Sequence, residues 1–198
     1  ENYATVGTSQ STGTRIVSLS GHVKKPGAYE VEMGKCTIKE IIEDLGGGVD
    51  GKEIKTVLLG GASGSLITPF KLDLKYTMED AENAGLTLGS GVIIVFNEKT
   101  CPVDLAHNLM GFFAFESCGK CTPCRVGTKT MLQILERICS GEGKMEDIDT
   151  LERLAVSIID AALCGLGKTA PNPVLTTLRY FRSEYEAHIL EKRCPAGV

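Results

Sequence analysis

Between Arg15 and Met33, hydrophobic and polar positions alternate in the way that two β-strands require. Pro26 and Gly27 lie between the two stretches, where a tight hairpin turn favours these residue types. The pattern therefore predicts an antiparallel hairpin. Its hydrophobic positions are Ile16, Val17, Leu19, Val23, Tyr29, Val31 and Met33.

A short helix and further strands follow the hairpin. Thr37 can cap a helix over residues 37–44, which the glycines at 46–48 end. Apolar stretches at 54–59 and 92–96 have the length of strands. A hairpin, then a helix, then more strands is the order of a β-grasp fold, in which a small mixed sheet covers one helix.

From Cys101 onward the hydrophobic period changes to the three-and-four spacing of amphipathic helices. Four such helices joined by short loops predict an all-α four-helix bundle, with the aromatic residues at 112, 113 and 115 in its core. The last helix is expected to begin at Asn172-Pro173. The four stripes are Leu105, Leu109, Phe112 and Phe113; Met131, Leu132, Leu135 and Ile138; Ile148, Leu151, Leu154, Ile158 and Ala162; and Leu175, Leu178, Phe181, Tyr185 and Ile189.

Together these patterns predict an α+β chain in three parts. Residues 1–14 are mostly Ser, Thr, Gly and Asn without a core pattern, so we expect a flexible tether. The β-grasp domain is expected at 15–97 and the helical bundle at 98–198. Because the chain begins with Glu and stops in a loop, we interpret it as a piece of a longer cytosolic protein.

Charge and hydropathy exclude two classes of partner. The 198 residues carry 21 basic and 25 acidic side chains, a formal net charge of −4, whereas nucleic-acid binding calls for a clustered excess of Lys and Arg. The strongest apolar run, 92–96, is far shorter than the ~18 residues of a membrane span. We therefore expect no nucleic-acid partner and no direct membrane insertion.

The cysteines indicate a metal centre. Three of the eight, Cys118, Cys121 and Cys124, fall in one C-x2-C-x2-C run, which favours one ion or cluster over separate disulfides. Cys164 is the best candidate for a fourth thiolate, if the helices on either side pack antiparallel. Four thiolates suit either a [4Fe–4S] cluster or a tetrahedral zinc, and the tight triple run favours the cluster. Lys120 and Arg125 would place positive charge beside it.

A second, weaker metal site is suggested by Cys101, His188 and Cys194. The two thiols bracket the helical region in sequence, and His188 lies near the end of the last helix. These three side chains, with a thiol beyond Val198, could hold a structural zinc. The alternative is that they are separate, uncoordinated side chains.

Two cysteine segments carry a resemblance to a known family. Residues 116–125, ESCGKCTPCR, and 162–173, ALCGLGKTAPNP, resemble the flavin-containing, NADH-oxidising subunit of respiratory complex I and the related subunits of NAD(P)-linked hydrogenases and formate dehydrogenases. Residues 18–31 are similar to the soluble-ligand-binding β-grasp (SLBB) domain of that subunit. The family usually has Glu at the position of Val126, which would change the surroundings of a cluster and not its ligands.

The resemblance implies that Cys118, Cys121, Cys124 and Cys164 ligate one [4Fe–4S] cluster. The chain would then be an electron-transfer fragment that relays single electrons from reduced FMN to a partner subunit. The family's FMN and NAD(P)H sites lie in an upstream domain that this chain does not contain, so no FMN-binding, NAD-binding or catalytic residue is expected here. The literal G-x-G-x-x-G match at 46–51 follows a helix and precedes a strand, the reverse of a dinucleotide loop.

The resemblance also implies partners and a location. The partners would be the [2Fe–2S] subunit and the large iron–sulfur subunit of the parent complex, together with the upstream FMN/NADH domain. The location would be cytoplasmic, at most peripheral to the inner face of the membrane through these subunits. An alternative function of a different class is a ligand- or partner-binding module that zinc stabilises and that has no redox activity.

Overall fold

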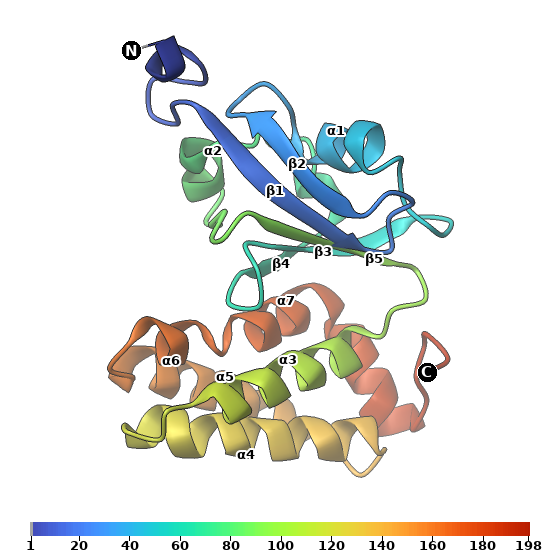
Figure 1. Cartoon of the computed structure of the whole chain (residues 1–198). Coiled ribbons are helices and arrows are strands. Elements are labelled where there is room, and N and C mark those ends of the chain that lie inside the picture. The colour runs from blue at the N-terminus through green and yellow to red at the C-terminus, as the bar shows by residue number, and fades with distance from the viewer. Residues whose placement is uncertain (1) are drawn as a thin grey trace. The chain divides into compact units, whose positions relative to one another are not determined.

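The computed structural model describes residues 2–198, which divide into two compact units between Glu98 and Lys99 (Figure 1). Glu1, the first residue of the expected tether, lies outside the described residues. Within the part of the chain that is described, no helix combines the length and the apolar composition needed to cross a membrane.

The first unit is built on a five-stranded mixed sheet with the order β2-β1-β5-β3-β4. The predicted hairpin is its antiparallel β1–β2 pair, whereas β1 and β5 run parallel although most of the unit lies between them in sequence. β3 pairs antiparallel with both β5 and β4. The strands are β1 (Thr14–Gly21), β2 (Gly27–Glu32), β3 (Ile54–Leu59), β4 (Ser65–Ile67) and β5 (Val92–Asn97).

Short helices accompany this sheet. The predicted helix is present as α1 (Ile38–Glu40), which continues as the π-helical turn η2 (Ile41–Leu45). Thr37 caps it as expected: its hydroxyl accepts from the Glu40 N–H while the Glu40 carboxylate accepts from the Thr37 N–H, a capping box. The remaining short elements, which the pattern did not predict, are η3 (Pro69–Lys71) and α2 (Met78–Asn83).

The core of the first unit lies between the α1–η2 helix and the sheet. Alternate strand residues and one helical stripe are buried there because a strand turns successive side chains to opposite faces. Its largest fully buried members include Leu19, Ile38, Ile41, Ile42, Leu59, Tyr76 and Ile93.

The N-terminal segment is structured where we expected a tether. Residues 2–5 form the 3-10 helix η1 (Asn2–Thr5), and the Met33 N–H donates to the Gly13 carbonyl. Ser11 is buried, and its hydroxyl and that of Thr8 both donate to the carboxylate of Glu79 in α2. Hydroxyl groups and a backbone hydrogen bond attach this segment to the sheet unit, and polar contacts of this kind leave no hydrophobic pattern in the sequence.

The second unit is all-helical. Its elements are α3 (Pro102–Glu116), α4 (Thr122–Cys139), α5 (Met145–Ala161), the short α6 (Gly165–Thr169), α7 (Asn172–Glu186) and the π-helical turn η4 (Ala187–Glu191). α3 packs on α4 and α7, and α5 packs on the same two helices, so the four long helices surround one core. The buried face of α3 consists of Pro102, Val103, Ala106, Met110 and Phe113. Phe112 and Phe115, which we expected in the core, are exposed.

Candidate metal centre

The C-x2-C-x2-C run lies at the turn between α3 and α4. Cys118 is exposed in the connecting loop, Cys121 occupies the capping position of α4, and Cys124 is buried in the first turn of that helix. Pro123 fits this first turn because a proline there lacks only an N–H that would have no helical partner. Gly119 has φ +76°, which an L side chain rarely adopts, and lets the loop reverse direction between the first two thiols.

Cys164 lies in a second turn, between α5 and α6, that folds against the first. The Cα of Gly167 in α6 lies so close to Cys124 that a Cβ added there would stand 3.6 Å from the Cys124 sulfur. Leu163, next to Cys164 in the chain, lies close enough to Cys121 for its backbone N–H to lower the pKa of that thiol. Both contacts join the two turns, so the structure brings the segment of Cys164 beside the triple run.

The surroundings of Cys121 favour its thiolate form. Interaction with the backbone N–H of Leu163 is the largest cause that lowers the pKa of this thiol, followed by the N–H of Cys124, with a further contribution from the charge of Arg125. The guanidinium of Arg125 is held in place by a 2.9 Å hydrogen bond to the Gly119 carbonyl. A thiolate is the form in which cysteine binds metal, so this environment suits a ligand.

Cys124 is the most enclosed of the four. Its sulfur lies 3.3 Å from the hydroxyl of Ser117 and faces Gly167 of α6. Cys118 and Cys164, by contrast, are exposed. Of the four thiols, that of Cys124 is therefore enclosed by protein, and those of Cys118 and Cys164 are open to solvent.

The three residues of the suggested second site also come together. The sulfurs of Cys101 and Cys194 and a ring nitrogen of His188 all lie within 4.8 Å of one another. Cys101 precedes α3, whereas His188 and Cys194 come from η4 and the segment after it. Cys36 and Cys139, which have no predicted role, are half-buried.

Comparison with known families matches both units. Residues 104–188 match the NADH-ubiquinone oxidoreductase-F iron-sulfur binding region, and residues 15–95 match the SLBB domain. The two matches follow one another along the chain, one in each unit. The three cysteines of the C-x2-C-x2-C run and Cys164 all fall inside the matched iron–sulfur region, whereas Cys101 and Cys194 fall outside it.

Individual relatives agree with this assignment. The chain is 43% identical over 197 residues to the NADP-reducing hydrogenase subunit HndC of Solidesulfovibrio fructosivorans, covering 99% of this chain and 40% of that protein. It is 40% identical over 191 residues to an F-type subunit of NADH-quinone oxidoreductase from Rhizobium meliloti, covering 96% and 45%. The chain therefore spans less than half the length of these two relatives.

A solved structure has the same fold. A chain of an NAD+-reducing [NiFe]-hydrogenase in the H2-reduced state superimposes with a TM-score of 0.85 at 31% identity, covering 98% of this chain and 33% of that one. The sequence did not predict the contact between Gly167 and Cys124 or the Leu163 N–H beside Cys121. The glycines at 165 and 167 were the only sign of a close approach there, and sequence could not tell which one makes it.

Proposed function

We propose that the chain is the electron-transfer part of an NADH-linked oxidoreductase and that its helical unit holds one [4Fe–4S] cluster through Cys118, Cys121, Cys124 and Cys164. The observation that carries the proposal is the match of residues 104–188 to an iron–sulfur binding region, together with the folding of the Cys164 turn against the triple run. When bound, such a cluster accepts and donates one electron at a time.

The sequence spacing of the thiols supports a cluster over a single ion. Three cysteines lie in one tight C-x2-C-x2-C run, which is the arrangement that ferredoxin-type iron–sulfur clusters use. Structural zinc sites more often take two separate C-x2-C pairs.

The residues around the thiols are suited to stabilise negative charge. The N–H groups of Leu163 and Cys124 lower the pKa of Cys121. α4 begins at Thr122, directly after Cys121, so the positive end of its dipole lies beside the thiols. Arg125 adds a fixed cation. Hydrogen bonds and charges of this kind set the reduction potential of a thiolate-bound centre.

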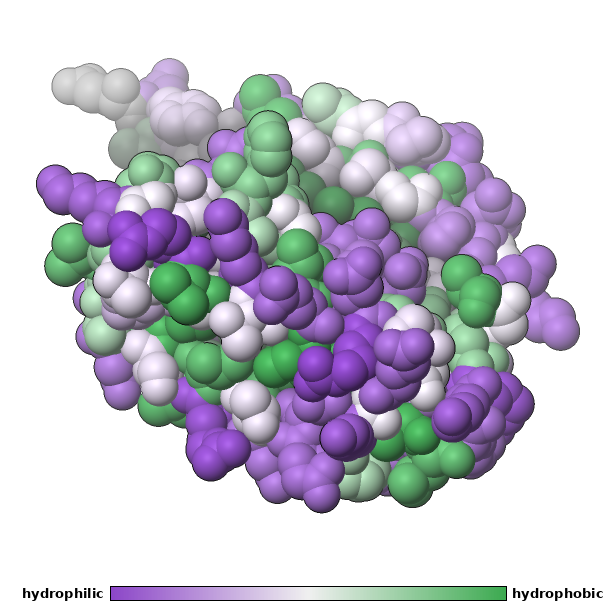
Figure 2. Space-filling model, turned by 90° about the horizontal axis from the view of Figure 1, so that it is seen from below, coloured by the Kyte–Doolittle hydropathy of each residue, from purple (hydrophilic) through white to green (hydrophobic). Residues whose placement is uncertain are grey.

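Exposed apolar side chains border the same site. Leu163, adjacent to Cys164, is 72% exposed, and Phe115, near the end of α3, is 86% exposed; Val126 follows closely after Cys124 and is also exposed. The face viewed in Figure 2 is largely hydrophilic with separate hydrophobic patches. Apolar groups exposed beside the thiols are suited to contact with another domain or subunit, which one-electron transfer requires.

The relatives extend the proposal to the parent enzyme. We infer an NADH:acceptor oxidoreductase in which an upstream FMN/NADH domain supplies electrons and the [2Fe–2S] and large iron–sulfur subunits are partners, at a cytoplasmic location. The names of the relatives, a subunit of NADH-quinone oxidoreductase and a subunit of a hydrogenase, support this inference. In the same way, the parallel β1–β5 pair and the α3-α4-α5-α7 packing support a β-grasp domain followed by a four-helix bundle.

Iron and sulfide analysis tests the proposal. We expect the protein purified without oxygen to be brown, to bleach with dithionite, and to contain about four iron and four sulfide per chain. Cys164→Ser should lose most of this iron. Cys36→Ser, which changes a half-buried thiol of the sheet unit, should keep it.

Two results would contradict the proposal. One is a colourless wild-type protein with zinc and no sulfide, which would favour the zinc-stabilised binding module. The other is full iron and sulfide content in Cys164→Ser with an unchanged electron paramagnetic resonance spectrum.

A further inference from the structure

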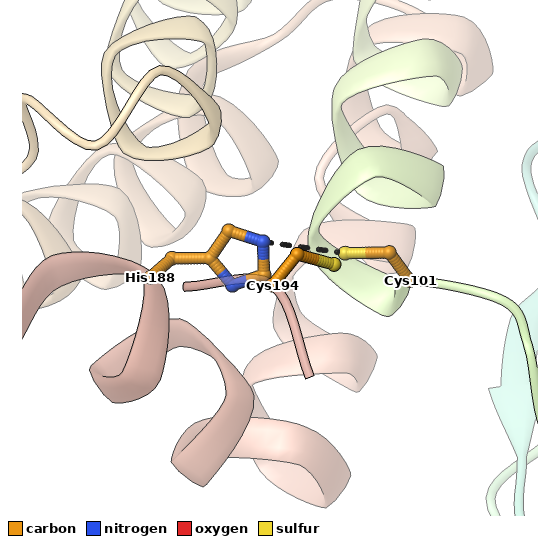
Figure 3. A group of neighbouring side chains, drawn as sticks. All are labelled: Cys101, His188 and Cys194. Atoms are coloured by element: carbon orange, nitrogen blue, oxygen red, sulfur yellow. Dashed lines mark hydrogen bonds between the residues drawn. The ribbon is translucent and has the colours of Figure 1, made fainter. Parts of the chain in front are cut away.

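Cys101, His188 and Cys194 converge on one point in the helical unit (Figure 3). The Nε2 atom of His188 lies 3.5 Å from the sulfur of Cys101, and the sulfur of Cys194 completes the group within 4.8 Å. Cys101 and His188 are almost fully buried, at 4% and 6% exposure. All three side chains are of types that commonly bind metal ions.

Two of the three ligands are held in an orientation that suits metal binding. The Nδ1 atom of His188 lies 2.7 Å from the Glu184 carbonyl, so Nδ1 carries the proton and Nε2 presents its lone pair to the two sulfurs. Cys101 occupies the capping position of α3, where its sulfur accepts from the Asp104 N–H at 3.5 Å. Backbone partners thus fix both side chains before any ion arrives.

The third ligand is brought back by an unusual turn. Lys192, just after η4, is the only non-glycine residue with positive φ among the described residues, at +50°, and it turns the chain so that Cys194 faces His188. The segment after η4 thereby places the sulfur of Cys194 beside the other two side chains.

We propose that Cys101, His188 and Cys194 bind a structural Zn²⁺ ion. With Zn–S of about 2.3 Å and Zn–N of about 2.05 Å, a tetrahedral ion places sulfur and nitrogen about 3.6 Å apart, close to the observed 3.5 Å. Cys101 interacts with both His188 and Cys194, so all three side chains face one point at which an ion could replace these contacts. A cavity of about 410 Å³ beside His188 and Cys194 leaves room for a fourth ligand.

This site is separate from the proposed cluster. Cys139, the last residue of α4, lines the same cavity as His188 and Cys194, whereas Cys121 and Cys124 lie at the first turn of that helix. At ~1.5 Å per residue, the 18 residues of α4 place the two sites about 25 Å apart. The ion would fasten the segment after η4 to the start of α3.

Metal analysis of the full chain tests the inference. We expect the wild type to contain one zinc per chain after expression with added zinc, and His188→Asn and Cys194→Ser to bind zinc at least about tenfold more weakly in competition with a colorimetric chelator. His107→Asn, on α3, and Cys36→Ser are matched controls that should keep the ion. Iron content and far-ultraviolet circular dichroism should be unchanged in His188→Asn, which shows that the variant still folds.

Substitution of Co²⁺ for Zn²⁺ gives a second, spectroscopic measurement that compares the wild type with a variant. We expect thiolate-to-cobalt charge-transfer bands in the wild type, and their loss in Cys194→Ser. Absence of zinc and cobalt binding in the wild type, or a Cys101–Cys194 disulfide in protein kept under reducing conditions, would overturn the inference. Because His188→Asn leaves the cluster cysteines intact and Cys164→Ser leaves this site intact, failure of one proposal is distinguishable from failure of the other.

Discussion

At the scale of the residue, Gly167 shows how a missing side chain helps to define the proposed cluster site. Its Cα lies where an added Cβ would stand 2.7 Å from the Cβ of Ala162 and 3.2 Å from the Cβ of Cys124. Such distances leave no room for a methyl group between two buried residues. Gly165, two residues earlier in α6, has nothing within 4 Å of the same position.

We therefore expect the two glycines to respond differently to the same substitution. Gly167→Ala should push the Cys164 turn away from Cys124 and reduce the iron bound per chain, at a cost to stability of about 1–3 kcal/mol. Gly165→Ala should keep the wild-type iron content. The measurement is iron and sulfide per chain after anaerobic purification, and equal iron content in both variants would show that this close approach does not shape the site.

At the scale of the element, an ion pair joins the end of α4 to the start of α5. The buried carboxylate of Asp147 accepts from Nε and one terminal nitrogen of Arg137 and, at 2.8 Å, from the backbone N–H of Lys144. Burial is the largest influence and raises the pKa of Asp147, but the hydrogen bonds and charges of Arg137 and Lys144 together outweigh it and the pKa is lowered.

This shift makes the contribution of Asp147 depend on pH. Because the folded-state pKa lies below the unfolded one, the stabilisation is fully present above the unfolded value of about 3.9 and is lost as pH falls through the folded value. Asp147→Asn should lower the free energy of unfolding by about 1–2 kcal/mol at pH 7, a range reduced for the partial exposure of Arg137. Denaturant titrations at pH 7 and below pH 4 check this, and a difference that does not shrink in acid would refute it.

The elements also show what periodicity can predict. The hairpin, the helix after Thr37 and the four long helices were all predicted, because each turns one continuous stripe of apolar residues toward a core. In contrast, α2 and the segment at residues 2–13 were missed. Their conformation depends on polar contacts, such as the hydrogen bonds from the Ser11 and Thr8 hydroxyls to Glu79. Such contacts leave no repeating pattern in the sequence.

At the scale of the whole molecule, the two units have separate cores. Every member of the core of the first unit lies between Val17 and Val95. Both proposed metal sites, in contrast, lie in the unit from Lys99 to Val198. Metals that bind only the folded state stabilise the unit that holds them.

We accordingly expect calorimetry to resolve two transitions that respond to different changes. Removal of metal by a chelator should lower the midpoint of one transition, that of the helical unit, and leave the other in place. Leu59→Ala, in the core of the sheet unit, should shift the other transition at a cost of about 2–5 kcal/mol. One transition that shifts as a whole in both experiments would contradict independent units.

The sequence by itself determined the elements and the chemistry. Apolar spacing decides which segments become strands and helices, and three thiols in one tight run already indicate a metal centre, because both are local properties of the chain. Only the tertiary structure decided which distant groups meet. Cys101, His188 and Cys194, and likewise Gly167 and Cys124, come together because helices of particular lengths pack against one another and a turn at Lys192 reverses the chain, and no local pattern specifies such distances.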